Sequence, residues 1–290
     1  MNTTRCLNKY PLLLNFLIST LLGLTAPSLA RAQQPTSVPG TPDVGYAPQE
    51  SQRHPGVFVV AALGDSITAA MDATSFGTDP VVSFATGTDP FVGSHAWRLQ
   101  QLMPHLQVRS INVSVGGAKS DDLARQATEA ARYFPDYATI LMGANDACSF
   151  FEARSHDLQR YVNNMAGAIN ILIQSNPAIQ IRLIPVPNIR RLYELGASQT
   201  HCRVKWSLSP MCRPMLSPLR SAASREDFFR LVDTYNAYLN VLAQRYPNNT
   251  TVSWNAAVHQ FELADVSQID CFHPSHVGHR TLSWLSFGEQ

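Results

Sequence analysis

Short apolar runs alternate with amphipathic stretches along the chain from about residue 57 to its end. The short runs are rich in β-branched residues and are closed by turn residues, which predicts buried β-strands over Val57–Leu63, Val108–Val115, Ala138–Met142, Ile179–Val186 and Thr250–Trp254. Helical spacing of apolar residues between them predicts helices over His95–Met103, Ser120–Phe134, Arg154–Ser175, Ser224–Tyr246 and His273–Phe287. This alternation predicts an α/β fold with a mostly parallel sheet and helices on both faces, in a strand order that the pattern leaves open.

Two stretches interrupt the alternation. Asp72–Ser94 is rich in Gly, Asp and Pro, and a loop of this length is typical of functional or lid-like segments. Gly196–Pro218 contains several prolines and two cysteines, and we expect it to be an excursion from the core.

The first residues have the pattern of an export signal. Arg5 and Lys9 precede the apolar stretch Leu12–Leu24, and Ala30-Arg31-Ala32 has the small-x-small form of a cleavage site. The apolar stretch is shorter than the roughly 20 residues that a membrane span needs. We therefore expect a signal peptide over residues 1–32, a secreted or periplasmic protein, and no stable membrane span.

The remaining chain divides into two parts by composition. Residues 33–55 are rich in Pro, Ser, Thr and Gln, which predicts a flexible leader. Residues 56–290 form the predicted domain. The chain has 22 Lys and Arg against 21 Asp and Glu, and this balance argues against a polyanionic partner. We therefore expect no nucleic-acid partner.

Polar motifs follow the ends of the predicted strands. Gly64-Asp65-Ser66 follows the first, Gly116-Gly117 the second, and Gly143-Ala144-Asn145-Asp146 the third. Because parallel strands end at one edge of the sheet, these motifs are expected to meet there. A serine nucleophile needs a base and an orienting acid, and Asp270 and His273, three residues apart, can supply both. A glycine N–H and an amide side chain can stabilise an oxyanion.

Together these motifs resemble the SGNH, or GDSL-type, hydrolase superfamily of esterases and lipases. Gly-Ala-Asn-Asp-x-Cys and Asp-Cys-Phe-His-Pro are most similar to its phospholipase B-like branch. The resemblance implies a flavodoxin-like, three-layer α/β/α sandwich with a central five-stranded sheet. It also implies Ser66 as nucleophile, His273 as base and Asp270 as the acid, with oxyanion donors from Ser66, Gly117 and Asn145. Ile67 and Ala144 replace the usual Leu and Gly of the family motifs.

The resemblance further implies a serine esterase without a metal or cofactor, acting as a monomer on a small-molecule or lipid ester. A lipid ester is our first hypothesis, and a carbohydrate acetylesterase is the second. A non-catalytic binding protein on the same scaffold is the alternative from another class. Phe84, Phe91 and Trp97 are candidates for an acyl groove or for core packing.

Several other residues have structural interpretations. We expect Asp65 to shape its turn through backbone amides, and Asp146 to be structural as well. His276 and His279 are assigned to the surface or packing of a helix rather than to a metal site, because Pro274 and Gly278 interrupt a regular ligand face.

Four cysteines follow the predicted signal peptide: Cys148, Cys202, Cys212 and Cys271. Their even number in an exported chain predicts two disulfides, and the absence of a C-x-x-C pair argues against zinc. Cys148 lies three residues after Asn145 and Cys271 two before His273. If these motifs share one site, we expect a Cys148–Cys271 bridge and a Cys202–Cys212 bridge.

Overall fold

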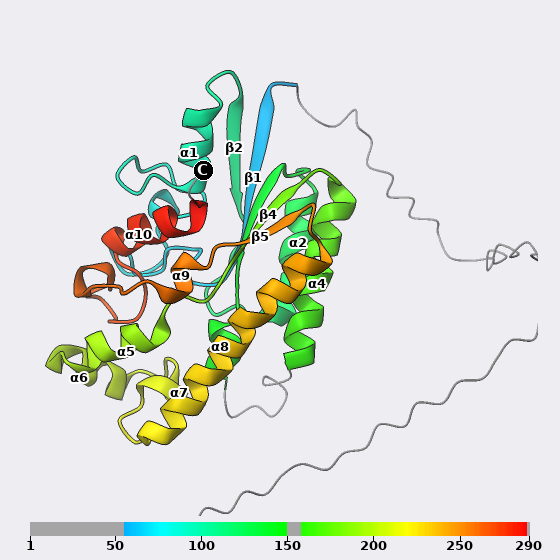
Figure 1. Ribbon diagram of the computed structural model, residues 1–290. Coiled ribbons are helices and arrows are strands. Elements are labelled where there is room, and N and C mark those ends of the chain that lie inside the picture. Colours follow the sequence, from blue (N-terminus) through cyan, green and yellow to red (C-terminus); the bar gives the residue numbers. More distant parts are fainter. Residues whose placement is uncertain (1–54, 150–157, 289–290) are drawn as a thin grey trace, which may run out of the picture. The chain divides into compact units, whose positions relative to one another are not determined.

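A parallel sheet of five strands forms the centre of the structure, a computed structural model that describes residues 55–149 and 158–288 (Figure 1). The spatial order is β2-β1-β3-β4-β5, which is a flavodoxin-like order. The α/β class and the central five-stranded sheet are therefore confirmed. The strands are β1 (Val57–Gly64), β2 (Gln107–Asn112), β3 (Tyr137–Leu141), β4 (Gln180–Ile184) and β5 (Thr250–Val252).

Helices cover both faces of this sheet (Figure 1). Side chains alternate along β1, so Ala61 and Leu63 pack on one face and Val60 and Ala62 on the other. The first face is covered by α2 (Leu123–Ala131), α4 (Leu158–Ser175) and α8 (Ala222–Arg245), and the second by α1 (His95–Leu102), α9 (Asn255–Val258) and α10 (His276–Phe287).

Local capping explains where several elements differ from their predicted bounds. β2 ends at Asn112 rather than Val115, because Asn112 Oδ1 accepts the Ser114 N–H at 3.1 Å and turns the chain. α8 begins after Ser221 rather than at Ser224, and the Ser221 hydroxyl accepts the Ser224 N–H at 3.1 Å.

The start of α10 matters for the site. Ser275 Oγ caps this helix by accepting the Gly278 N–H at 3.0 Å, so the helix begins at His276 and not at His273. His273 consequently lies in the loop before the helix. The long loop predicted over Asp72–Ser94 is partly core, since Phe84 and Val92 are fully buried. A 3₁₀ turn, Pro80–Val82, lies within it.

Between β4 and α8 the chain leaves the sheet and forms α5 (Ile189–Ala197), α6 (Thr200–Leu208) and α7 (Arg213–Leu216). We call residues 189–216 the α5–α7 segment. In Figure 1 its helices lie together beyond the C-terminal ends of the strands. The remaining short elements are α3 (Ala144–Cys148) and the 3₁₀ turns Ser120–Asp122 and Leu263–Asp265.

Some sequence predictions fall outside the described residues. These are the signal peptide over 1–32, nearly all of the leader over 33–55, and the first residues of the helix predicted from Arg154. Among the helices of the described ranges, none combines the length and the apolar character that a membrane crossing requires.

Candidate active site

Ser66 lies in a tight turn directly after β1. Glycine is required before it, because a Cβ at Gly64 would lie 2.2 Å from Thr68 Oγ1 and 2.7 Å from the Leu141 carbonyl oxygen. Asp65 Oδ1 accepts the Ile67 N–H at 2.9 Å and closes the turn, as the sequence predicts. The result is a serine that is almost buried at the C-terminal edge of the sheet.

His273 and Asp270 reach Ser66 from the loop before α10. His273 Nε2 lies 2.8 Å from Ser66 Oγ, and His273 Nδ1 is hydrogen-bonded to Asp270 Oδ2. The other carboxylate oxygen, Oδ1, accepts the N–H groups of Phe272 at 2.8 Å and of His273 at 3.1 Å. The carboxylate is thus fixed in place by its own loop, and it holds the imidazole by one nitrogen while the other faces the serine.

Opposing influences act on the pKa of Asp270, and the net effect is to lower it. Burial, the largest single influence, raises the pKa, but the hydrogen bond and the charge of His273 and the two backbone amides together outweigh it. Asp270 is therefore held ionised beside the imidazole. In this arrangement the imidazole, held by the carboxylate, can remove the proton of the serine hydroxyl as the hydroxyl oxygen attacks a carbonyl carbon.

Asn145 lies in the first turn of α3, which begins after Gly143, two residues beyond the end of β3. Its Nδ2 donates to the Ala118 carbonyl at 3.1 Å and makes a longer contact of 3.4 Å with Asp65 Oδ2. Gly117, with a φ of +78°, is exposed in the chain just before Ala118. The loops after β1, β2 and β3 therefore meet beside Ser66, as their motifs predict.

Two buried carboxylates join these loops. Asp146 accepts the Ser120 N–H at 3.0 Å and the Ser120 hydroxyl at 2.6 Å, which connects α3 to the loop after β2. Burial raises the pKa of Asp146, and it raises the pKa of the fully buried Asp65 to about 6. These contacts confirm the structural interpretation of both residues.

The comparison with known families identifies this arrangement. The family model for GDSL-like lipase/acylhydrolase matches residues 60–283, which is most of the 290-residue chain. The chain belongs to the GDSL-like lipase/acylhydrolase family. The predicted SGNH membership is therefore confirmed.

Individual relatives of this GDSL-family chain are distant. Phospholipase B1, membrane-associated, from Homo sapiens is 25% identical in an alignment 278 residues long that covers 78% of this chain but only 18% of that protein. A catalytic mutant of Axe2, an acetylxylan esterase from Geobacillus stearothermophilus, has a TM-score of 0.50 at 18% identity, covering 80% of this chain and 95% of its own. For the lipase Lip_vut3 from a goat rumen metagenome the TM-score is 0.49 at 17% identity, with 79% and 95% covered.

An apolar pocket opens beside the serine and histidine of this GDSL-family site. The space among its lining atoms, including the open mouth, is about 580 Å³. Ile67 and His273 form the end nearest Ser66, and the wall is mainly aliphatic and aromatic, with Val186, Pro187, Ile189, Leu192, Phe261, Val266, Phe272, Pro274 and Leu282 among its members.

The sequence-based candidates for an acyl groove are not the residues that line this pocket. Phe84 is fully buried in the core, and Phe91 packs on the His276 ring with a centroid distance of 4.7 Å. Trp97 is not among the lining residues either. Phe261 and Phe272 take the aromatic positions instead. Phe272 could have been found from its place beside His273, whereas Phe261 had no signal in the chain.

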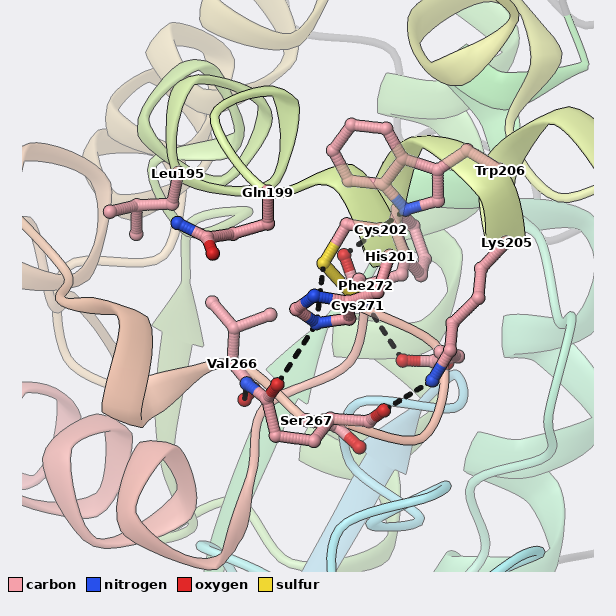
Figure 2. Close-up of a disulfide and its surroundings, with 12 residues drawn as sticks. Leu195, Gln199, His201, Cys202, Lys205, Trp206, Val266, Ser267, Cys271 and Phe272 are labelled. Atoms are coloured by element: carbon pink, nitrogen blue, oxygen red, sulfur yellow. Dashed lines mark hydrogen bonds between the residues drawn. A yellow bond between two sulfur atoms is a disulfide. The ribbon is translucent and has the colours of Figure 1, made fainter.

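The predicted disulfide pairing is wrong, although all four cysteines are bridged. The bridges join Cys148 to Cys212 and Cys202 to Cys271, with Cα–Cα distances of 4.6 and 5.5 Å. Cys148 is the last residue of α3, and its partner Cys212 lies directly before α7. Cys271 faces α6 instead (Figure 2). Both bridges therefore join the α5–α7 segment to a loop of the site.

Helix α6 makes further contacts with the loop that contains Asp270, and the sequence analysis missed them. Lys205 Nζ donates to the carbonyls of Gln268 at 2.5 Å and Ile269 at 2.9 Å, and Trp206 Nε1 donates to the Cys271 carbonyl at 3.3 Å (Figure 2). No spacing rule relates residues more than sixty positions apart, so the chain offered no signal for these contacts.

Two groups of potential metal ligands occur in the described ranges, and both are already engaged. In the first, with His201, the sulfurs of Cys202 and Cys271 are bonded to each other. The second consists of Asp72 with the hydrogen-bonded pair Asp270 and His273. A metal ion in either group would have to displace these bonds.

The two later histidines act in packing, in line with their sequence interpretation. His276 Nε2 contacts Asp89 Oδ2 at 2.7 Å, which connects α10 to the long loop. His279 is fully buried, and its Nδ1 accepts the Phe84 N–H at 3.3 Å. Burial, with smaller contributions from His273 and His276, lowers the pKa of His279 to about 3, so it is neutral in the core.

Proposed function

We propose that the protein is an exported serine hydrolase that cleaves esters of fatty acyl chains through an acyl-enzyme on Ser66. The 2.8 Å contact between Ser66 Oγ and His273 Nε2 is the observation on which the proposal rests, and His273 also lines the apolar pocket. A predicted signal peptide and two disulfides support export, because disulfides persist in oxidising compartments.

Three side chains carry out the proposed reaction. Ser66 Oγ attacks the ester carbonyl carbon while its proton passes to His273 Nε2, and Asp270 stabilises the imidazolium. The tetrahedral intermediate then collapses, and the leaving alcohol takes the proton from His273. Water, activated by the same imidazole, cleaves the acyl-enzyme and returns the serine.

The negative charge on the carbonyl oxygen requires hydrogen-bond donors. We assign them to the backbone N–H groups of Ser66 and Gly117 and to the side-chain amide of Asn145. One Asn145 N–H holds the Ala118 carbonyl and so orients the amide, whereas its contact with Asp65 is long at 3.4 Å. That second N–H is the one we expect to turn to the oxyanion.

The pocket favours a long acyl chain over an acetyl group. Each CH₂ group that moves from water to an apolar wall contributes about 0.8 kcal/mol of favourable free energy. A pocket with this lining should therefore bind longer acyl chains more tightly. The similarity to a phospholipase B is consistent with a lipid ester. Because an acetylxylan esterase is among the similar structures, a carbohydrate acetyl ester is the second candidate substrate.

A panel of p-nitrophenyl esters of increasing chain length, with phospholipid and acetylated xylan alongside, tests this proposal. We expect kcat/KM to rise with chain length over the first several carbons and acetylated xylan to be a poor substrate. Leu192→Trp, which fills the pocket wall, should shift the optimum to shorter chains. Val241→Trp, on the exposed side of α8, should not.

Two outcomes would contradict the proposal. An optimum at acetyl esters that Leu192→Trp leaves in place would favour the acetylesterase. No turnover of any ester, with no difference between the wild type and Ser66→Ala, would favour a non-catalytic binding protein.

A further inference from the structure

The chain around α6 and α7 has a one-sided charge. From Leu195 to Arg225 there is no Asp or Glu, but five basic residues occur: Arg203, Lys205, Arg213, Arg220 and Arg225. The whole chain, by contrast, has nearly equal numbers of acidic and basic residues. An acid-free stretch of this kind in a balanced protein creates a local positive potential.

Two of these cations are exposed without a neutralising carboxylate. Arg203 donates to the Ala197 carbonyl at 2.9 Å and the Thr200 hydroxyl at 3.2 Å, which are uncharged partners. Arg213 is exposed at the start of α7. Within the described part of the chain, neither arginine forms a salt bridge, and both can therefore meet an external anion.

Large apolar side chains project from the same region. Leu208, the last residue of α6, is 82% exposed, and Leu219, which follows α7, is 94% exposed. Val204, one helical turn before Leu208, is half exposed. The opposite side of α6 is buried through Cys202 and Trp206, so the helix presents its leucine and arginine to the outside.

This surface belongs to the segment that builds the site. α5 contributes Ile189 and Leu192 to the pocket wall, and α6 is bonded to the catalytic loop through Cys202–Cys271. α6 and α7 are in contact with each other. A surface that engages α6 and α7 would therefore hold its lipids close to the pocket.

We propose that Arg203, Val204, Leu208, Arg213 and Leu219, which we call the α6–α7 face, bind the protein to an anionic lipid surface. This inference rests on the proposed function, since it supplies a lipid ester to the same pocket. Leucines enter the boundary between headgroups and acyl chains, and arginines pair with lipid phosphates. Both kinds of side chain are exposed here, and the two arginines form no salt bridge with any described residue.

Vesicle binding of the full-length chain with Ser66→Ala tests the inference without any ester cleavage. We expect co-sedimentation with phosphatidylcholine vesicles that contain about 30% phosphatidylglycerol, weak binding to pure phosphatidylcholine, and loss of binding as salt is raised. Leu208→Ser with Leu219→Ser, and separately Arg203→Gln with Arg213→Gln, should each weaken binding by roughly tenfold or more.

Matched controls come from equally exposed positions elsewhere. Phe76→Ser removes a side chain that is 86% exposed, and Arg132→Gln removes an exposed arginine paired with Glu129. Neither should change vesicle binding. All of these variants should retain the wild-type kcat/KM on a water-soluble p-nitrophenyl ester when Ser66 is present.

The outcomes separate this inference from the proposed function. Failure of the Ser66→Ala protein to bind anionic vesicles, or equal binding by all variants, would overturn the docking face while soluble-ester hydrolysis still supports the enzyme. Vesicle binding without hydrolysis of any ester would retain the docking face and overturn the enzyme. If the leucine variants change only the oligomeric state, the face is a contact between two copies.

Discussion

The loops at the strand ends and the α5–α7 segment are held in place by different means. The loops that contain Ser66 and Asn145 depend on buried hydrogen bonds of the sheet framework, such as those of Asp146 with Ser120. The α5–α7 segment depends on two disulfides and on contacts from Lys205 and Trp206 to the loop of Asp270.

Both regions contact the same hydrophobic core, since Ile189, Trp206 and Leu216 of the α5–α7 segment belong to it. The strand-end loops, however, follow the strands directly, and the hydrogen bonds between Asp146 and Ser120 are buried and shielded from water. The α5–α7 segment is a group of short helices, and short helices are marginal without tertiary support. Covalent bridges add to the support from the core, and the Cys202–Cys271 bridge connects the segment to the residue after Asp270. The serine is thus placed by the sheet, and the loop that contains its acid is supported by the α5–α7 segment.

Removing Asn145 should have the largest effect on the strand-end region. Asn145→Ala is expected to lower kcat by about 10²–10³-fold with KM little changed, because the lost N–H acts on charge that develops in the transition state. Asn145→Asp should be at least as damaging, since a carboxylate repels the oxyanion. Steady-state kinetics measure the effect. A kcat within tenfold of wild type together with a lower melting temperature would show that Asn145 has only a structural role, through its hydrogen bond to the Ala118 carbonyl.

The two disulfides offer a matched pair for the α5–α7 segment, because they close loops of similar length, 69 and 64 residues. Replacing either pair by serines should cost about 2–4 kcal/mol of unfolding free energy. Only Cys202→Ser with Cys271→Ser should also lower kcat, by about tenfold, since Cys271 is next to Asp270 and a 1 Å misplacement can cost more than that. Equal kcat values for both double variants would show that the α5–α7 segment does not help to position Asp270.

Burial of the Asp65 carboxylate should make the stability of the protein depend on pH. Burial raises its pKa from 3.8 to about 6, so the folded state binds more protons than the unfolded state between these values. Stability should therefore fall as the pH rises from about 4 to about 6, by up to about 3 kcal/mol. Asp65→Asn removes this dependence. In denaturant unfolding, the unfolding free energy of the variant relative to the wild type should increase by about 1–3 kcal/mol between about pH 4 and about pH 7.5. Asp227→Asn, at an exposed position, should show no such gain, and a parallel pH dependence for both variants would contradict the buried-carboxylate account.

Lys205 should give the smallest effect. Lys205→Met removes two hydrogen bonds to the carbonyls before Asp270, and we expect kcat to fall a few-fold with KM unchanged. Lys205→Arg should restore most of the loss, and Arg203→Met on the same helix should be neutral on a soluble ester. A change in KM alone would place Lys205 in substrate binding rather than in positioning the acid.

The same contrast explains what could be predicted from the sequence. Alternating apolar runs predict the strands, short motifs at their ends predict Ser66 and Asn145, and a motif before the last helix predicts the Asp270–His273 pair. Each of these depends on neighbours within a few residues. The disulfide partners depend on how α3 and α6 are directed in space. Phe261 in the pocket and Lys205 behind Asp270 likewise act over long separations, for which spacing contains no information.

The central claim is that Ser66 is the nucleophile activated by His273 and Asp270. Treatment with a p-nitrophenyl alkylphosphonate, followed by peptide mass spectrometry, tests it directly. We expect one adduct on the peptide that contains Ser66, formed together with loss of activity, absent from Ser66→Ala and strongly slowed in His273→Ala. Labelling of a different residue, or no labelling of an active protein, would contradict the account.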